Sequence, residues 1–288
     1  MTRIIDSLAE IAQDYDVLFC DLWGCVHNGR VAYPAAIAAL QDFRRQGGRV
    51  ALMTNAPRPR RFVAEQIARL NVPRDAWDDI VTSGDAAQDA MWAGEVGRRV
   101  WHIGTEKDLG FFAGPDDPRA SGIERVAFED AEGIVATGPF DETNETPEDY
   151  REVLEQAAAR GLKMLCANPD IVVDVGETRI YCAGALAELY EQIGGTALYF
   201  GKPHAPIYDL ARRHLGIDAG VRILCIGDGV VTDVMGANAQ GLDCLFVAQG
   251  IHGDQAKGED GALDPARAAA LLKAETTYAR YAALELNW

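Results

Sequence analysis

The chain has 288 residues, of which 44 are acidic and 27 basic, giving a formal charge of −17 at neutral pH. A field this negative repels nucleic acid and anionic membrane surfaces, so we expect neither as a partner. With 48% apolar and 25% charged residues, the composition is typical of a globular protein with one large or two medium domains.

The first strand is predicted to end in a single carboxylate. Apolar residues at helical spacing over residues 1–15 indicate a lead-in helix. An apolar run at 16–20 then reads as a buried parallel strand that ends at Asp21, and Gly24 and Gly29 mark a loop after it. In open α/β sheets ligands bind at this edge, so Asp21 is a candidate functional residue.

A second strand is predicted to end beside the first. Residues 34–45 have the pattern of a helix, and an apolar strand at 49–53 runs into Thr54 and Asn55. Strand, helix and strand in succession predict a parallel sheet with right-handed crossovers. The hydroxyl and amide of Thr54 and Asn55 should therefore share an edge with Asp21, where they could hold the oxygens of an anion.

The pattern changes at residue 84 and returns at 198, which predicts a smaller inserted α/β domain over 84–197 within a core of 1–83 and 198–288. Thr146 and Pro147 begin a helix with a capping-box pattern. The 107–122 segment reads as a loop. Strands of the insertion are expected near 99–103, 123–127, 133–137, 163–166 and 178–182.

The second segment of the predicted core, residues 198–288, contributes a lysine and two more carboxylates. Lys202 lies at a helix start, with the helix following Pro203 and His204, and both its charge and the helix N-terminus favour phosphate. An apolar strand at 221–226 leads to Asp228, and Thr232 is expected to cap a short helix that carries Asp233. A last strand is expected at 243–247, with a terminal helix from 264.

Three carboxylates at one sheet edge repel one another unless a cation lies between them. Asp21, Asp228 and Asp233 are such a set, and Mg²⁺ prefers carboxylates, carbonyls, waters and substrate phosphate oxygens. The sequence therefore predicts a Mg²⁺ site and an anionic substrate.

The motifs together resemble those of the haloacid dehalogenase superfamily of aspartate-nucleophile hydrolases. They are Asp21-Leu22-Trp23-Gly24, Thr54-Asn55, Gly201-Lys202-Pro203, and Gly227-Asp228 followed by Asp233. The place of the insertion, with Asn168-Pro169-Asp170, resembles the type IIA, NagD-like branch and its large α/β cap. The resemblance covers nearly the whole chain and implies an α/β fold, with a Rossmann-like doubly wound parallel core and an inserted cap domain.

This resemblance implies roles for the candidate residues. Asp21 would be the nucleophile that forms an aspartyl-phosphate. Thr54, Asn55 and Lys202 would hold the phosphoryl oxygens, while Asn168 and Asp170 of the cap would contact the substrate. The Mg²⁺ ligands would be Asp21, the backbone carbonyl of Trp23, Asp228 and, indirectly, Asp233.

Trp23 departs from the family pattern, which has there an Asp that protonates the leaving oxygen. Losing a general acid–base group typically costs about 10²–10⁴-fold in rate. A good leaving group, a group from the cap or the substrate, or His27 could compensate. His27 is a candidate proton donor because histidine titrates near neutral pH.

The predicted function is Mg²⁺-dependent hydrolysis of a small phosphorylated metabolite, such as a sugar phosphate. The alternative is a weakly active or non-catalytic homologue that binds such metabolites. Carbon–halogen hydrolysis is disfavoured because Asp228 and Asp233 would then lack a cation, and phosphonate cleavage needs a cap lysine, for which only Lys107 and Lys163 are available. No G-x-G-x-x-G or P-loop pattern supports nucleotide binding.

The six cysteines form no C-x-x-C pair and lie mostly in apolar runs, which is typical of buried free thiols in a reducing cytoplasm. Packing is the expected role of Cys20 and Cys25, which flank Asp21. A cytoplasmic location is expected because the sequence shows no leader and no long apolar run. The substrate and a homodimeric state stay open.

Overall fold

The computed structural model describes residues 2–114, 120, 122–175 and 178–288. The chain divides into two compact units. The first unit comprises Met1–Thr54, Ala64–Val81 and Lys202–Trp288, and the second comprises Asn55–Val63 and Thr82–Gly201. Within the described residues, every helix is too short or too polar to cross a membrane.

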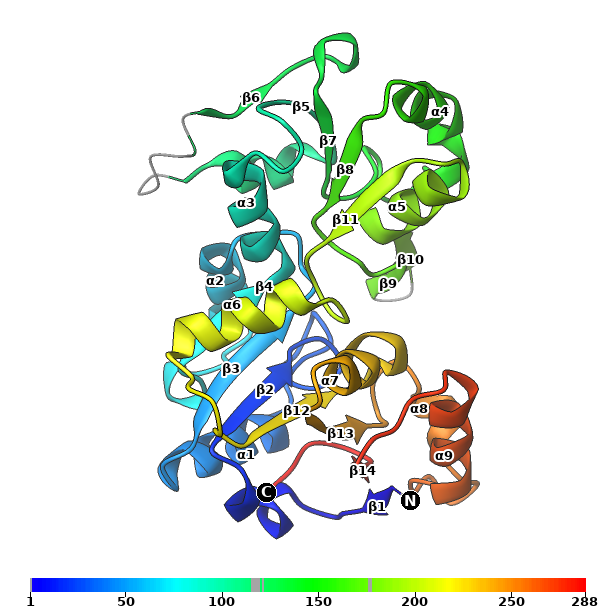
Figure 1. The fold of residues 1–288 in the computed structure, drawn as a ribbon. Helices are drawn as coiled ribbons and strands as arrows, with labels where there is room; N and C mark the ends of the chain where they lie inside the picture. The colour runs from blue at the N-terminus through cyan, green and yellow to red at the C-terminus, as the bar shows by residue number, and fades with distance from the viewer. Residues whose placement is uncertain (1, 115–119, 121, 176–177) are drawn as a thin grey trace. The chain divides into compact units, whose positions relative to one another are not determined.

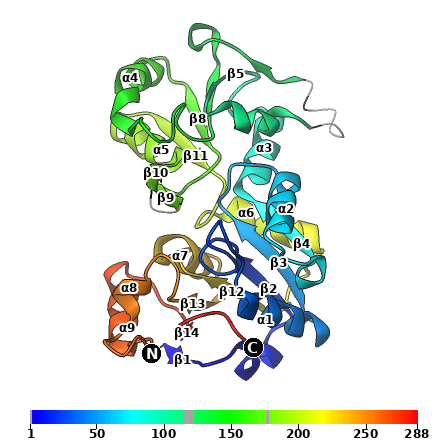
Figure 2. The same ribbon diagram turned by 180° about the vertical axis from the view of Figure 1, so that it is seen from behind.

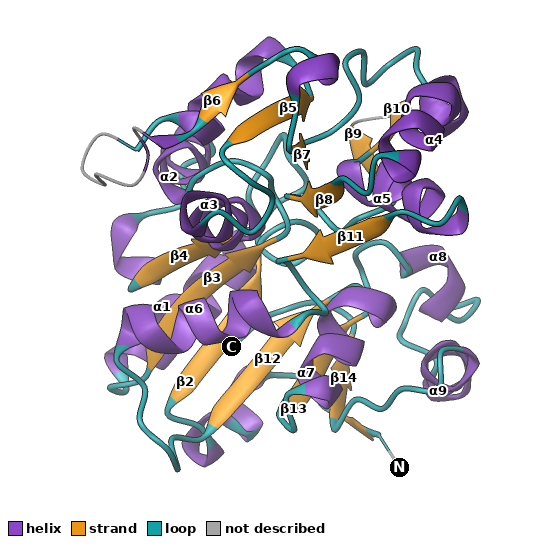
Figure 3. Cartoon of the chain, turned by 45° about the horizontal axis from the view of Figure 1, so that its top comes forward, coloured by secondary structure: helices purple, strands orange, loops and turns teal. Residues whose placement is uncertain are grey.

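The first unit is built on a seven-stranded sheet in the order β1-β14-β13-β12-β2-β3-β4 (Figure 1). Its central strands β2 (Val17–Asp21) and β12 (Ile223–Gly227) are buried along their whole length, which explains their uninterrupted apolar sequences. The pairs β2–β3 and β2–β12 are parallel, and Figure 3 shows these three strands running in the same direction. The other strands are β1 (Arg3–Ile4), β3 (Arg49–Thr54), β4 (Asp79–Thr82), β13 (Asp243–Val247) and β14 (Tyr281–Ala283).

Helices cover both faces of this sheet, as the doubly wound prediction requires. Helix α1 (Pro34–Arg45) lies on one face and α6 (Ala205–Leu215) on the other, as the two opposite views of Figures 1 and 2 show. The remaining helices that lie wholly or partly in this unit are α2 (Arg60–Arg69), α7 (Met235–Ala239), α8 (Gly253–Ala256) and α9 (Pro265–Ala274).

Three predicted details of this unit are wrong. The lead-in helix is absent from the described part of residues 1–15, where β1 precedes two short 3-10 turns because Arg3 and Ile4 pair with β14 instead. Strand β14 itself was not predicted. Thr232 does not cap a helix but lies inside a π-helical turn, Val230–Val234, which begins where the Gly229 N–H bonds to Asp233 Oδ2 at 3.1 Å.

The second unit has its own five-stranded sheet in the order β11-β8-β7-β5-β6, with parallel neighbours, and an antiparallel hairpin of β9 and β10. The predicted capping box at Thr146 and Asp149 is present. Strand β11 (Thr196–Tyr199) pairs with β8 and so belongs to this sheet. The other strands are β5 (Arg99–Ile103), β6 (Glu124–Arg125), β7 (Gly133–Ala136), β8 (Lys163–Cys166), β9 (Val172–Val175) and β10 (Thr178–Tyr181).

Two apolar clusters hold the second unit together. One packs Leu154, Leu186 and Tyr190 against one face of the sheet, and the other packs Trp92 and Phe111 with strands β5, β7 and β8. The loop predicted over 107–122 is wrong in its first part, since residues Glu106–Phe112 form a 3-10 helix, and its residues 115–119 and 121 lie outside the described residues. The helices are α3 (Ser83–Ala93), α4 (Arg151–Ala159) and α5 (Ala183–Gln192).

Candidate active site

Asp21 ends the central strand β2, at the carboxyl edge of the sheet in the first unit. Its side chain is buried, with 6% of the residue exposed. Cys20 pairs with Ile226 of β12, so Asp228 leaves the neighbouring strand at nearly the same level. On the other side, Asp21 pairs with Met53, and Thr54 ends that strand. The predicted convergence of Asp21, Thr54 and Asp228 at one edge is therefore present.

Lys202 ties two of the carboxylates together inside this unit. Its Nζ donates hydrogen bonds to Asp21 Oδ1 at 2.5 Å and to Asp233 Oδ1 at 2.7 Å. Burial disfavours the charged lysine, but the two carboxylates outweigh it, so the pKa of Lys202 is raised well above its usual range. The ammonium is thus held charged, in contact with one oxygen of each carboxylate.

The Asp228 carboxylate is clamped by the backbone. Its Oδ2 accepts a hydrogen bond from the Ile251 N–H at 2.7 Å. A Cβ atom on Gly24 would lie 2.1 Å from the same oxygen, and one on Gly250 would lie 1.8 Å from it, so both positions need glycine. Burial, followed by the charge of Asp233, raises the pKa of Asp228 to about 7.

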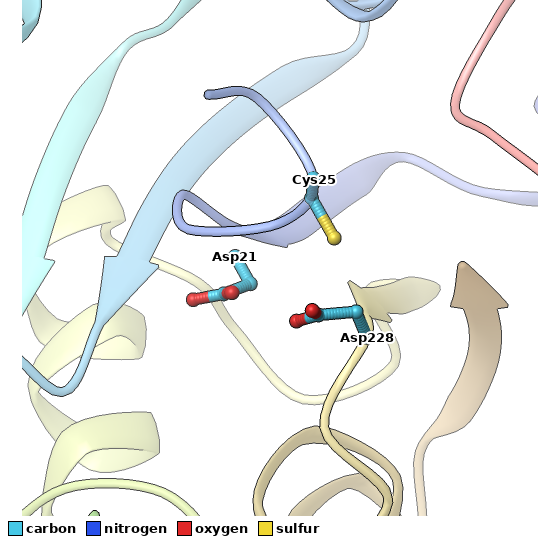
Figure 4. Close-up of side chains that lie close together, drawn as sticks. All are labelled: Asp21, Cys25 and Asp228. Carbon is cyan, nitrogen blue, oxygen red and sulfur yellow. The ribbon is translucent and has the colours of Figure 1, made fainter. Parts of the chain in front are cut away.

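Asp21, Asp228 and Cys25 offer ligand atoms that all lie within 4.8 Å of one another. Figure 4 shows the Cys25 sulfur close to the carboxyl groups of Asp21 and Asp228. Burial raises the pKa of Asp21 well above its usual range, Asp233 and Asp228 add to this rise, and Lys202 opposes it. Two buried carboxylates that repel each other in this way fit a divalent cation, which would neutralise both.

Trp23 and His27 pack together in the loop that follows β2. Their rings are 5.4 Å apart in an edge-on arrangement, and His27 is only 3% exposed. The Gly29 N–H donates to His27 Nδ1 at 2.9 Å, and burial lowers the pKa of His27 to about 4. His27 is therefore a neutral imidazole at pH 7, with its proton on Nε2, which weakens the case for it as a proton donor.

The second unit holds its own predicted residues close together. Asn55 Nδ2 donates to Asp170 Oδ1 at 2.8 Å, and the Asp170 N–H donates to Asn168 Oδ1 at 3.0 Å. A Cβ on Gly184 would lie 2.2 Å from the Pro169 carbonyl oxygen, so the second residue of helix α5 is a glycine where the 168–170 turn passes. Asn55, Asn168 and Asp170 thus form one hydrogen-bonded group.

Sequence reasoning missed two parts of this arrangement. Cys25 lies in the carboxylate cluster, whereas packing was its expected role; its position four residues after Asp21 was the only local signal. The Gly250–Ile251 segment that holds Asp228 is remote in sequence and gave no signal. Asp233 was expected to support the metal indirectly, and its carboxylate contacts Lys202 and the Gly229 N–H.

Comparison with protein-family models finds two matches. The model described as "Haloacid dehalogenase-like hydrolase" matches residues 18–114, and one described as a HAD-hydrolase-like family matches residues 199–273. Both matched segments contain parts of the site, Asp21 and Thr54 in the first and Lys202, Asp228 and Asp233 in the second.

Solved and curated proteins give consistent similarities. A "Hydrolase, haloacid dehalogenase-like family" from Brucella suis 1330 is 43% identical, with a TM-score of 0.83 over 98% of this chain and 100% of that one. The D-glycerol 3-phosphate phosphatase of Mycobacterium tuberculosis is 29% identical over 85% of this chain, which spans 66% of that protein's length. A crystal structure of glycerol phosphate phosphatase from M. tuberculosis in complex with magnesium is 26% identical, with a TM-score of 0.65 over 89% of this chain and 75% of that one.

Proposed function

Since this chain belongs to the haloacid dehalogenase-like family of hydrolases, we propose that it is a phosphomonoesterase of small phosphorylated metabolites. The observation that carries the proposal is the buried Asp21 carboxylate, hydrogen-bonded to Lys202 and lying beside Asp228 at the carboxyl end of the central strand. The phosphatase named among its relatives supports a phosphoric monoester hydrolase, and suggests glycerol phosphate or a sugar phosphate as the substrate to test first.

In the proposed reaction an Asp21 oxygen bonds to phosphorus while the bond from phosphorus to the ester oxygen breaks. The leaving oxygen takes the electron pair and then a proton, and water later hydrolyses the aspartyl-phosphate. Covalent catalysis of this kind divides one difficult displacement into two easier ones. Lys202 reduces the repulsion between the Asp21 carboxylate and the anionic substrate, because its ammonium lies 2.5 Å from Asp21 Oδ1.

The residues that would hold Mg²⁺ are Asp21, Asp228 and the backbone carbonyl of Trp23. A bound divalent cation supplies Lewis-acid stabilisation of the charge that develops on the transferring phosphoryl group. Asp228 is oriented for this purpose by the Ile251 N–H, and Asp233 acts indirectly by fixing Lys202. The magnesium in the related phosphatase structure supports a divalent cation here.

Thr54, Asn55 and Lys202 are proposed to hold the phosphoryl oxygens. Thr54 ends β3 and is 9% exposed, so its side chain is largely enclosed at the same edge as Asp21. We propose that the second unit is the inserted cap, expected over 84–197, and that its Asn168 and Asp170 select the substrate.

A weakly active or purely phosphometabolite-binding protein is the second candidate, because position 23 is an indole that cannot donate a useful proton. The neighbouring His27, with a pKa lowered to about 4, is mostly unprotonated at pH 7. A rate loss of about 10²–10⁴-fold is the usual consequence of a missing general acid. A long-lived phosphoryl group on Asp21 would distinguish a slow enzyme from a binding protein.

The test is a panel of phosphate monoesters, assayed for released phosphate with Mg²⁺ present. Glycerol 3-phosphate, several sugar phosphates and p-nitrophenyl phosphate cover alkyl and aryl leaving groups. We expect turnover of at least one by the native protein, none by Asp21→Asn, and full retention by Asp218→Asn, which changes an exposed carboxylate. Equal activity of the native and Asp21→Asn proteins would overturn the proposal.

A further inference from the structure

We propose that Cys25 makes the cation site thiophilic, so that its thiolate joins Asp21 and Asp228 in binding Zn²⁺ and Zn²⁺ displaces Mg²⁺ as an inhibitor. The inference rests on the proposed function, which places a divalent cation at Asp21 and Asp228. It goes further by assigning a third side chain to the site and a different class of cation as its ligand.

The first observation is the position of the sulfur. Cys25 is 2% exposed, and its Sγ lies within 4.8 Å of oxygens on both Asp21 and Asp228. Figure 4 shows the side chain leaving the loop after β2 in the direction of the two carboxyl groups. Zinc bonds of about 2.0–2.3 Å in tetrahedral geometry place ligand atoms roughly 3.5 Å apart, so zinc binding would draw these atoms closer together by no more than about 1.5 Å.

The second observation concerns the hydrogen bonding of the Cys25 thiol, compared with that of two other cysteines. Cys20 donates its S–H to the Asp21 carbonyl at 3.3 Å, and Cys166 donates to the Asn168 carbonyl at 3.3 Å. For Cys25, no hydrogen bond of the sulfur is found among the described residues. A buried polar group that faces two carboxylates without a partner of its own is available as a ligand.

The loop that carries Cys25 is fixed by its backbone. The Val26 and His27 N–H groups both donate to the Leu22 carbonyl, at 2.9 and 3.1 Å, and the Gly24 N–H donates to the His27 carbonyl at 2.8 Å. Gly24 has a φ of +84°, which glycine adopts without strain. The thiol is therefore held near both carboxylates before any ion arrives, which reduces the cost of ordering a ligand.

The chemistry of the donor set separates the two classes of cation. Mg²⁺ takes oxygen ligands, so Cys25 remains a protonated thiol beside it and contributes nothing. Zn²⁺ and Cd²⁺ accept sulfur, and their binding forms a metal–sulfur bond while the thiol proton is released to solvent. Because zinc prefers four ligands, binding to Cys25, Asp21 and Asp228 would leave it fewer open positions for a phosphoryl oxygen than octahedral Mg²⁺ has, which would slow turnover.

The experiment uses Co²⁺ and Cd²⁺ as spectroscopic probes on the full chain. We expect a thiolate-to-metal charge-transfer absorption in the native protein and in the control Cys20→Ala, and its loss in Cys25→Ser. The affinity for Cd²⁺ in chelator competition should fall in Cys25→Ser on the order of 10–100-fold or more. The affinity for Mg²⁺ should stay nearly unchanged, because oxygen ligands alone bind it.

A charge-transfer band that survives in Cys25→Ser, or that the native protein never shows, would overturn the inference. Cys25→Ala repeats the measurement if the serine variant fails to fold, as judged by circular dichroism. If Mg²⁺ binding depends on Asp228 but Co²⁺ and Cd²⁺ give no thiolate band, the inference about Cys25 is wrong and the proposed function still stands. If the native protein binds no divalent cation at all, the proposed function is contradicted as well.

Discussion

His27→Asn should make the protein less sensitive to acid, and the structure gives the size of the effect. The His27 ring is buried and accepts a hydrogen bond at Nδ1 from the Gly29 N–H. The Oδ1 of asparagine can replace Nδ1 as the acceptor, and asparagine does not titrate. The substitution therefore removes the buried ionisable group while retaining the hydrogen bond from the Gly29 N–H.

The magnitude follows from the pKa of His27, which burial lowers from 6.5 to about 4. Below pH 6.5 His27 binds a proton in the unfolded chain but not in the folded protein, so the free energy of unfolding decreases as the pH falls towards 4. At pH 5 the linkage amounts to about 2 kcal/mol relative to pH 7.5. The native protein should lose this amount, and His27→Asn should not.

The assay is urea unfolding of both proteins at pH values from 7.5 to 5, with the difference in unfolding free energy taken at each pH. His102 of the second unit also has a pKa lowered to about 4 by burial, but it is present in both proteins and cancels in the difference. Parallel stability curves for the two proteins would refute the conclusion that His27 is buried as a neutral imidazole. They would also restore His27 as a candidate proton donor near neutral pH.

Further predictions concern the carboxylates and the cation. Lys202→Met should lower the unfolding free energy by about 3–5 kcal/mol, because Asp21 and Asp233 would be left buried without their ammonium partner; an unchanged urea midpoint would contradict this. Gly250→Ala should weaken Mg²⁺ binding, measured by calorimetry, because the added Cβ would displace Asp228. Gly253→Ala is the control, since its added Cβ meets nothing closer than 3.8 Å and should leave the affinity unchanged. Equal Mg²⁺ affinities of the two variants would show that the backbone around Gly250 does not position Asp228 for the cation. Chelation by EDTA should abolish phosphate release and added Mg²⁺ should restore it, and turnover that persists in EDTA would exclude a required cation.

The strands around the site could be predicted closely because burial on both faces gives each an unbroken apolar sequence. The predicted strand at 243–247 matches β13, and those before Asp21 and Asp228 match β2 and β12 within two residues. Parallel pairing of these strands is enough to predict that Asp21, Thr54 and Asp228 share one edge of the sheet. The prediction of these strands and of their shared edge depends only on the local pattern of apolar residues and on the handedness of the crossover connections.

The features of the fold and the site that the sequence did not predict depend on contacts between residues distant in sequence. The lead-in helix failed because β1 pairs with β14, nearly the full length of the chain away. The clamp on Asp228 comes from Gly250 and Ile251, which no motif marks. His27 was a candidate proton donor on the ordinary pKa of histidine, but the Trp23 ring packs beside it and the residue is buried, which the sequence around it did not indicate.

The most direct test of the proposed chemistry is to trap the covalent intermediate. The native protein is mixed with p-nitrophenyl phosphate and Mg²⁺, quenched in acid within one turnover, digested and analysed by mass spectrometry. We predict a single phosphoryl group, removable by hydroxylamine, on the peptide that contains Asp21, and no such group in Asp21→Asn. Phosphorylation of a different residue, or product release by the Asp21→Asn protein at the native rate, would contradict the assignment of Asp21 as the nucleophile.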